Sequence, residues 1–110
     1  MADVLKVLGQ LDAAATTTET LYTVPDQAMT TTSSLVVCNR TAGSITFRVS
    51  VHVAGAGADD AQYLFYDAPL AANSTLTAVL GLTLNQDDVI KTYTSAVDMS
   101  FNLFGVETTD

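Results

Sequence analysis

The chain has 110 residues, of which 48% are hydrophobic and 15% charged, a composition typical of a compact globular domain and not of a disordered chain. Twelve acidic residues against four basic ones give a net charge of −8, the wrong sign for neutralising phosphates, so nucleic acid is excluded as an expected partner. We expect one domain over residues 1–110 and, because about 18 consecutive apolar residues are never reached, no membrane.

The first predicted element covers residues 1–15. Its apolar residues follow neither a strand period nor a helix period, so it fits either an ordinary first strand or an arm that docks on a neighbouring subunit. Residues 11–15 also fit a single helical turn. A signal peptide is not expected, because a basic leading region is missing and polar residues interrupt the apolar stretch. The residues of a candidate subunit interface here are Val4, Leu5, Val7 and Leu8.

Further along the chain, short segments rich in β-branched and aromatic residues are separated by turn residues, a pattern that predicts strands. In chain order they span residues 20–24, 34–39, 45–53, 62–66, 74–80, 89–94 and 97–103. Alternation in the last segment breaks near Phe104 and Gly105, where we expect a bulge. The predicted fold is all-β: a two-sheet antiparallel sandwich, jelly-roll or immunoglobulin-like, of about seven or eight strands.

Two of these segments are apolar on both faces. In residues 62–66, Tyr63 and Phe65 share one predicted face, and Tyr66 lies on the other; residues 35–38 are also apolar throughout. Such a strand is either central in the sandwich or covered by another subunit. Tyr63 and Tyr66 therefore join the candidate interface.

The residue types that carry most catalytic and metal chemistry are scarce. The single histidine, His52, falls on the polar side of its segment and is expected to face solvent or an interface, and the single cysteine, Cys38, is expected to be buried. The acidic pairs at 59–60 and 87–88 lie in predicted turns without the spaced ligands of a calcium loop, so we expect solvated turns. We predict a protein that is not an enzyme, with no catalytic, metal-binding or cofactor-binding residues.

Several short phrases together carry a family resemblance over nearly the whole chain. They are LYTVP at 21–25, VVCNR at 36–40, FRVSV at 47–51, QYLFYD at 62–67, GLTL at 81–84 followed by DVI at 88–90, and the ending 101–107. Read in this order, they resemble small virion structural proteins of tailed bacteriophages. One departure is Asp87, where the family pattern has a glycine before Asp88.

The resemblance implies a β-sandwich or jelly-roll unit present in many copies on the virion, with no catalytic motif. Its leading implication is a capsid decoration, or cement, protein that binds the lattice of the major capsid protein as a symmetric homo-oligomer, with a trimer favoured. The alternative is a collar or tail-fibre module that binds carbohydrate or a host receptor. In either case the protein is expected to be made in the host cytoplasm and to reside in the virion, with itself and other virion proteins as partners.

Overall fold

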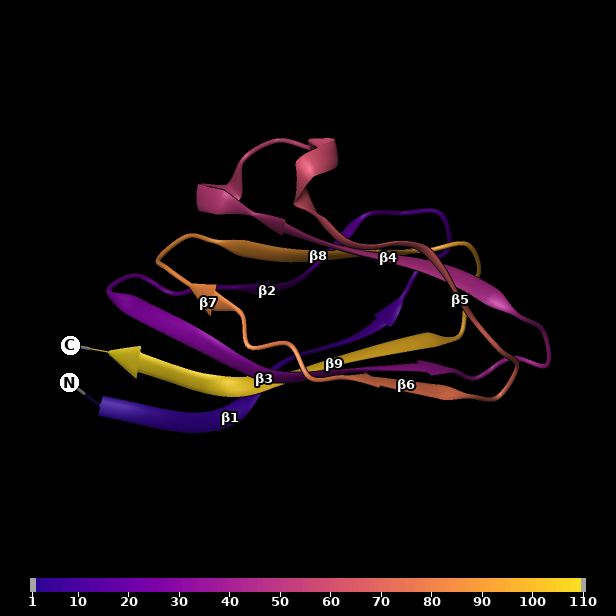
Figure 1. Ribbon diagram of the computed structural model, residues 1–110, viewed down its shortest axis with the longest axis horizontal. Helices are drawn as coiled ribbons and strands as arrows, with labels where there is room; N and C mark the ends of the chain where they lie inside the picture. The colour runs from indigo at the N-terminus through magenta and orange to yellow at the C-terminus, as the bar shows by residue number, and fades with distance from the viewer. Residues whose placement is uncertain (1, 110) are drawn as a thin grey trace.

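Two antiparallel β-sheets pack face to face in the computed structural model, which describes residues 2–109 (Figure 1). Residues 1 and 110, the two ends of the predicted domain, lie outside the described range. The first sheet has the strand order β1-β9-β3-β6, with β7 also paired to β3, and the second has the order β2-β8-β4-β5. The predicted all-β sandwich is therefore confirmed.

Nine strands make up the two sheets in the described part of the chain, slightly more than predicted. They are β1 (Ala2–Ala13), β2 (Glu19–Thr23), β3 (Ala28–Asn39), β4 (Ile45–His52), β5 (Tyr63–Leu70), β6 (Thr75–Ala78), β7 (Thr83–Leu84), β8 (Val89–Thr94) and β9 (Met99–Thr109). Two short 3₁₀ helices, η1 (Val53–Gly55) and η2 (Asp60–Gln62), connect β4 to β5. The count rises because the predicted segment at 74–80 is followed by the separate short strand β7.

The long strands of the first sheet extend beyond their predicted limits. β1 runs to Ala13, so the helical turn predicted for residues 11–15 is wrong, and the first segment forms a strand at the edge of the sheet. Its docking on a neighbouring subunit stays a prediction. β3 begins at Ala28 instead of residue 34, because threonines at alternate positions there are buried between the sheets. The ends of β1 and β9 near the chain termini project beyond the strands of the second sheet (Figure 1).

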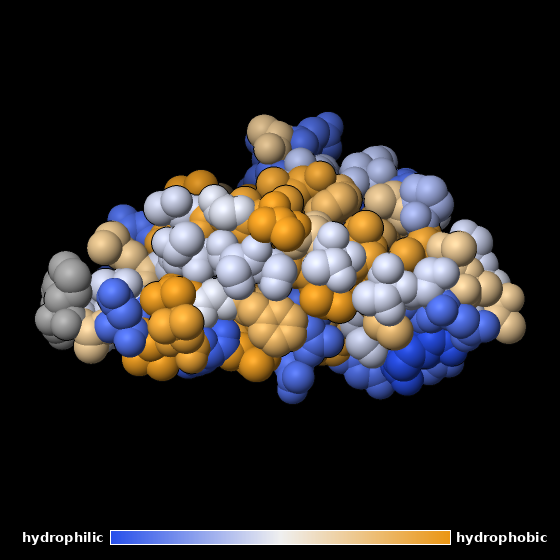
Figure 2. All heavy atoms as spheres, turned by 60° about the horizontal axis from the view of Figure 1, so that its bottom comes forward, coloured by the Kyte–Doolittle hydropathy of each residue, from blue (hydrophilic) through white to orange (hydrophobic). Residues whose placement is uncertain are grey.

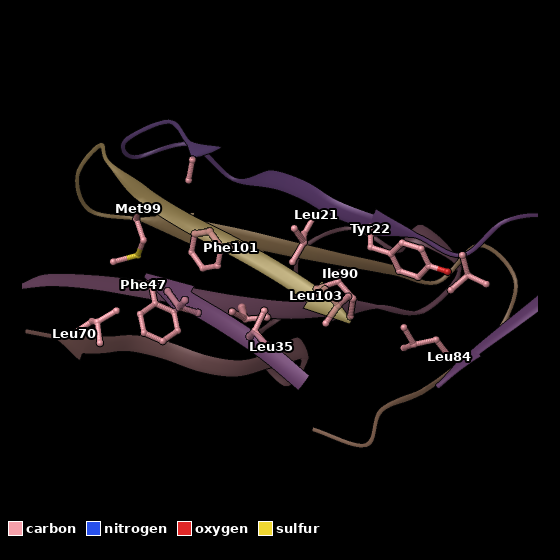
Figure 3. Packing of buried hydrophobic residues seen from close by; sticks show 14 of the residues in the cluster. Leu21, Tyr22, Leu35, Phe47, Leu70, Leu84, Ile90, Met99, Phe101 and Leu103 are labelled. Atoms are coloured by element: carbon pink, nitrogen blue, oxygen red, sulfur yellow. The ribbon is translucent and has the colours of Figure 1, made fainter. Parts of the chain in front are cut away.

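The hydrophobic core fills the space between the two sheets (Figure 3). Phe47 of β4 and Phe101 of β9 point toward each other across this space, with ring centroids 6.1 Å apart at an edge-on angle of 68°. Edge-to-face contacts of this kind stabilise the fold beyond simple burial of the rings. Phe65 of β5 packs against Phe47 at 5.4 Å, so the edge strand of the second sheet is also held to the core.

β9 is paired along both sides, and both of its neighbours bulge at the same level. Leu8 is the extra residue in β1, between Val7, which pairs with Phe104, and Gly9. β3 has a matching register shift between Thr32 and Ser34. The bulge predicted near Phe104 thus lies in the flanking strands, because β9 itself keeps strict alternation of inward and outward residues.

Gly105 allows β9 to lie close to the backbone of β3 at the level of these bulges. A Cβ atom at this position would clash with the carbonyl oxygen of Thr31 and lie 2.9 Å from the Cα of Thr32, both of them backbone atoms that side-chain rotation cannot move. The residue therefore has to be glycine for steric reasons, although its φ angle is not in the left-handed region.

We expect Gly105→Ala to lower the free energy of unfolding by about 2 kcal/mol or more, because the backbone of β3 must shift to admit the methyl group. The matched control is Gly81→Ala, where a Cβ would meet nothing within 4 Å. The control should change stability by less than about 0.5 kcal/mol. Urea denaturation of both variants measures the difference, and equal midpoints would contradict this account of the bulges.

Candidate interaction surfaces

His52 is buried, with 4% of its surface exposed, so the prediction that it faces solvent or an interface is wrong. It does lie on the polar side of β4, but the segment between β4 and β5 covers it. Its Nδ1 lies 2.8 Å from the carbonyl oxygen of Ala56, which can only accept, so Nδ1 donates and Nε2 accepts from the Ser50 hydroxyl at 2.8 Å. Both side chains are inaccessible, and we assign the pair a structural role.

Two other sequence predictions about polar residues need correction. Asp88 is buried and accepts hydrogen bonds from the backbone N–H groups of Ala54 (2.9 Å) and Asn85 (2.8 Å), so it joins η1 to the turn before β8 instead of being solvated. Cys38 is only half-buried, because it points outward from β3 opposite Ser100. Within residues 2–109, no group of three or more His, Cys, Asp or Glu side chains could hold a metal ion. No described helix is long and apolar enough to cross a membrane.

The outer face of the first sheet carries an apolar surface where β1, β9 and the start of β3 run side by side. We call it the β1–β9 patch. Figure 2 shows an apolar group near the end of this face where the chain ends lie, further apolar residues along its middle, and hydrophilic residues at the opposite end. Leu5 is 80% exposed and Val7 46%. The residues of the patch are Leu5, Val7, Met29, Phe104 and Val106.

The predicted interface residues of the first segment divide between two faces. Leu5 and Val7 lie together in the β1–β9 patch, whereas Val4 is on the inward face beside Glu107, yet 50% exposed because the sheet projects there. Leu8 occupies the bulge and packs against the core. Phe104 and Val106 complete this surface and were not predicted as interface residues, although the break in alternation near Phe104 was the available signal.

A second surface lies on the outer face of the other sheet, where tyrosines surround Arg48. The Arg48 guanidinium carbon lies 4.3 Å from the ring centroid of Tyr66 and 4.6 Å from that of Tyr93, distances typical of cation–π contacts. Arg48 also donates to the two carboxylate oxygens of Asp67, at 2.6 and 3.2 Å. These hydrogen bonds lower the pKa of the Asp67 carboxyl, so the pair stays charged and holds the guanidinium in a fixed orientation.

Tyr63 and Tyr66 lie on the same face, with ring centroids 4.8 Å apart at 76°, so their predicted placement on opposite faces is wrong. The register of β5 shifts between its pairs with Ser50 and Val49, and this shift turns Phe65 inward and both tyrosines outward. We call Tyr63, Tyr66, Tyr93 and Arg48 the tyrosine cluster. β5 is an edge strand, which excludes a central position; coverage by another subunit stays a prediction.

An open hollow beside the tyrosine cluster is lined by Asp60, Tyr63 and Tyr66. Tyr66 is 59% exposed, and the Asp60 side chain is exposed as well. The hollow therefore combines aromatic rings with a carboxylate that can accept hydrogen bonds. Such a combination suits a small polar ligand with an apolar face.

A polar cluster under the β1–β9 patch joins the two sheets. The Tyr22 hydroxyl of β2 donates to Glu107 Oε2 of β9 at 2.6 Å, and Thr30 of β3 bonds the same hydroxyl at 2.7 Å. Lys6 of β1 donates to Glu107 Oε1 at 3.1 Å. The Tyr22 hydrogen bond, assisted by Lys6, lowers the pKa of Glu107, whereas burial and the Glu107 carboxylate raise the pKa of Tyr22.

Comparisons with known proteins support the fold. No family model matches the chain, and no curated protein matches it. Among solved structures, 96% of the chain superposes on a chain in the structure of the infectious bursal disease virus Gx strain, with a TM-score of 0.55 and 12% identity. A chain in the crystal structure of the T13 particle of the same virus matches with a TM-score of 0.53, again at 12% identity and 96% coverage.

These likenesses show the fold alone, because the identity is so low. The chain spans about a third of the length of the virus chains that it matches, 32% and 29% respectively. By its fold, the protein is a β-sandwich module that is similar to part of the virus chains it matches. Its accessible features are two outward surfaces, the β1–β9 patch and the tyrosine cluster.

Ionised Glu107 should make stability depend on pH. Because its pKa in the folded state lies below the ordinary value of 4.5, its contribution is fully present above about pH 4.5 and is lost as pH falls through the folded pKa. We expect Glu107→Gln to cost about 2 kcal/mol at pH 7 and less as the pH approaches 3. Urea midpoints measured from pH 7 to pH 3 test this, with the exposed Asp60→Asn as control. A cost for Glu107→Gln that is constant with pH would contradict the role given to the ionised carboxylate.

Proposed function

We propose that the chain is a non-enzymatic structural component of a virion, and more particularly a capsid decoration, or cement, protein of a tailed bacteriophage. The observation that carries the proposal is the likeness of almost the whole chain to a module within virus-particle chains. The phrases that resemble phage virion proteins support the same reading.

In this proposal the protein binds the lattice of the major capsid protein as a symmetric homo-oligomer. A small sandwich offers two broad outer faces, so one surface can contact the lattice while another contacts a neighbouring copy. The β1–β9 patch supplies apolar contact area of the kind that marks interaction surfaces on soluble domains. The net charge of −8 would steer each copy toward a basic region of the lattice.

A binding experiment on particles tests the proposal. We expect the purified protein to co-sediment with particles assembled from a genome that lacks this gene, and to saturate them at a fixed ratio to the major capsid protein. Bound protein should raise the melting temperature of the particle, because it adds contacts that unfolding must break. Absence of saturable binding, or a copy number of only a few per particle, would overturn the decoration role.

A second candidate function is a collar or tail-fibre module that binds carbohydrate or a host receptor. The specific observation in its favour is the hollow beside the tyrosine cluster, where Tyr63 and Tyr66 border the carboxylate of Asp60. A sugar ring could pack its apolar face on a tyrosine ring while its hydroxyls donate to Asp60. This function predicts a low copy number, the opposite of the decoration role.

Saccharide binding can be separated from folding with paired variants. On a glycan array, we expect Tyr66→Ala to lose at least about tenfold in apparent affinity for any saccharide bound by the native protein, whereas Tyr66→Phe should retain the ring contact and most of the binding. Thermal denaturation of both variants checks that the sheet is intact. No binding by the native protein, or equal binding by Tyr66→Ala, would remove this candidate.

A further inference from the structure

The free edge of β1 differs from the other sheet edges of the molecule. Within residues 2–109, β1 pairs only with β9, so its opposite side carries unpaired backbone N–H and C=O groups. The first six residues of the strand, 2–7, are all exposed, and they include Val4, Leu5 and Val7. A long exposed edge with apolar side chains is a template for pairing with another strand.

The remaining edges in the described chain are interrupted or short. β5 has two register shifts, a left-handed residue at Asp67 (φ 49°) and a proline at position 69. β2 has five residues and a register shift, and β6 and β7 have four and two residues. These features are ordinary protection against edge pairing. On β1, Lys6 does not protect in this way, because its ammonium group is directed to Glu107 at 3.1 Å.

We propose that residues 2–7 of β1 pair antiparallel with the same segment of a second copy of this chain across a two-fold axis, which joins the two first sheets into one. The inference rests on the proposed homo-oligomeric virion function and names the surface that such an oligomer uses. A second copy fits this edge because a two-fold contact requires only one unprotected edge, presented twice. A closed trimer would need β1 to pair with a different edge, and the others are short or bulged. We therefore infer two-fold pairing in place of the trimer suggested by the family resemblance.

The charges and apolar residues of the strand select a register. With an axis perpendicular to the sheet, residues on the same face lie opposite one another. Centring the axis on Leu5 places Leu5 against Leu5 of the second copy and Lys6 against Val4 of the second copy. Centring it on Lys6 would place two ammonium groups directly opposite each other, which is unfavourable. The Leu5-centred register also continues the β1–β9 patches of the two copies into a single band.

A matched pair of charge substitutions tests the pairing. Leu5 is 80% exposed and Val79, between β6 and β7, is 84% exposed, so lysine at either position should leave the fold unchanged. We expect the full chain to form dimers in sedimentation equilibrium and Leu5→Lys to weaken the dimer at least about tenfold. Val79→Lys should change the dissociation constant less than about twofold. Circular dichroism and melting temperature confirm that both variants fold.

Disulfide trapping tests the register independently. In a Cys38→Ser background, we expect Leu5→Cys to form a covalent dimer under mild oxidation, because directly opposed residues bring their Cβ atoms within about 5 Å. Val79→Cys, equally exposed but away from the edge, should remain monomeric under the same conditions. A faster reaction at Val79→Cys than at Leu5→Cys would overturn the Leu5-centred pairing.

Other results would also overturn the inference. A native protein that stays monomeric at about 100 µM, or one that forms trimers, excludes two-fold pairing through β1. Hydrogen exchange in β1 that is as fast on the particle as in the free monomer would show that the edge stays unpaired. The proposed function fails separately: a dimer that never binds particles leaves the pairing intact, whereas particle binding by a monomer leaves the function intact without the pairing.

Discussion

The close approach of three strands around Gly105 is the constraint on which the first sheet depends. On one side of this residue the apolar side chains of β9 face the core, and on the other side they face outward. Because β9 can come so near to the backbone of β3, both flanking strands bulge at that level while β9 keeps its alternation of inward and outward residues. On one side of this level, Phe101 and Leu103 point inward and polar residues point outward. On the other side, Phe104 points outward and Glu107 points inward, so a single strand supplies both the core and the surface patch.

Beyond Gly105, inward polar residues join the two sheets beside the buried apolar residues Ala28 and Leu84. Tyr22 reaches across from the second sheet and donates to Glu107, which is neutralised by Lys6. A buried carboxylate without these partners would be costly, so Glu107 requires its hydrogen bonds. The buried Glu107 and the apolar patch on the opposite face both result from one change along β9, where the apolar residues pass from the inward face to the outward face. Apolar side chains that would fill a core elsewhere are thereby available at the surface.

The sequence predicts the sheets well and the surfaces less well, for identifiable physical reasons. Alternation in 45–53 correctly assigns β4, but it cannot show that a connecting segment covers the polar side and buries His52. The break in alternation at Phe104 is a real signal. However, a bulge within β9 and a change of its apolar residues from the inward to the outward face produce the same sequence pattern. Tyr63 and Tyr66 are three residues apart and share a face only because β5 bulges, and register shifts of an edge strand leave no simple periodicity.

An exposed apolar edge is a hazard for a free monomer, and its presence here is understandable if copies meet mainly on a particle. Each copy carries a net charge of −8, and repulsion between free copies acts over a screening length of about 8 Å at physiological salt. That repulsion opposes uncontrolled edge-to-edge growth in solution. On a lattice that binds each copy, neighbours are held at a high effective concentration, so even a modest edge contact is occupied. Under the proposed function, the net negative charge and the free edge of β1 would act together, because association between copies would be weak in solution and favoured on the particle.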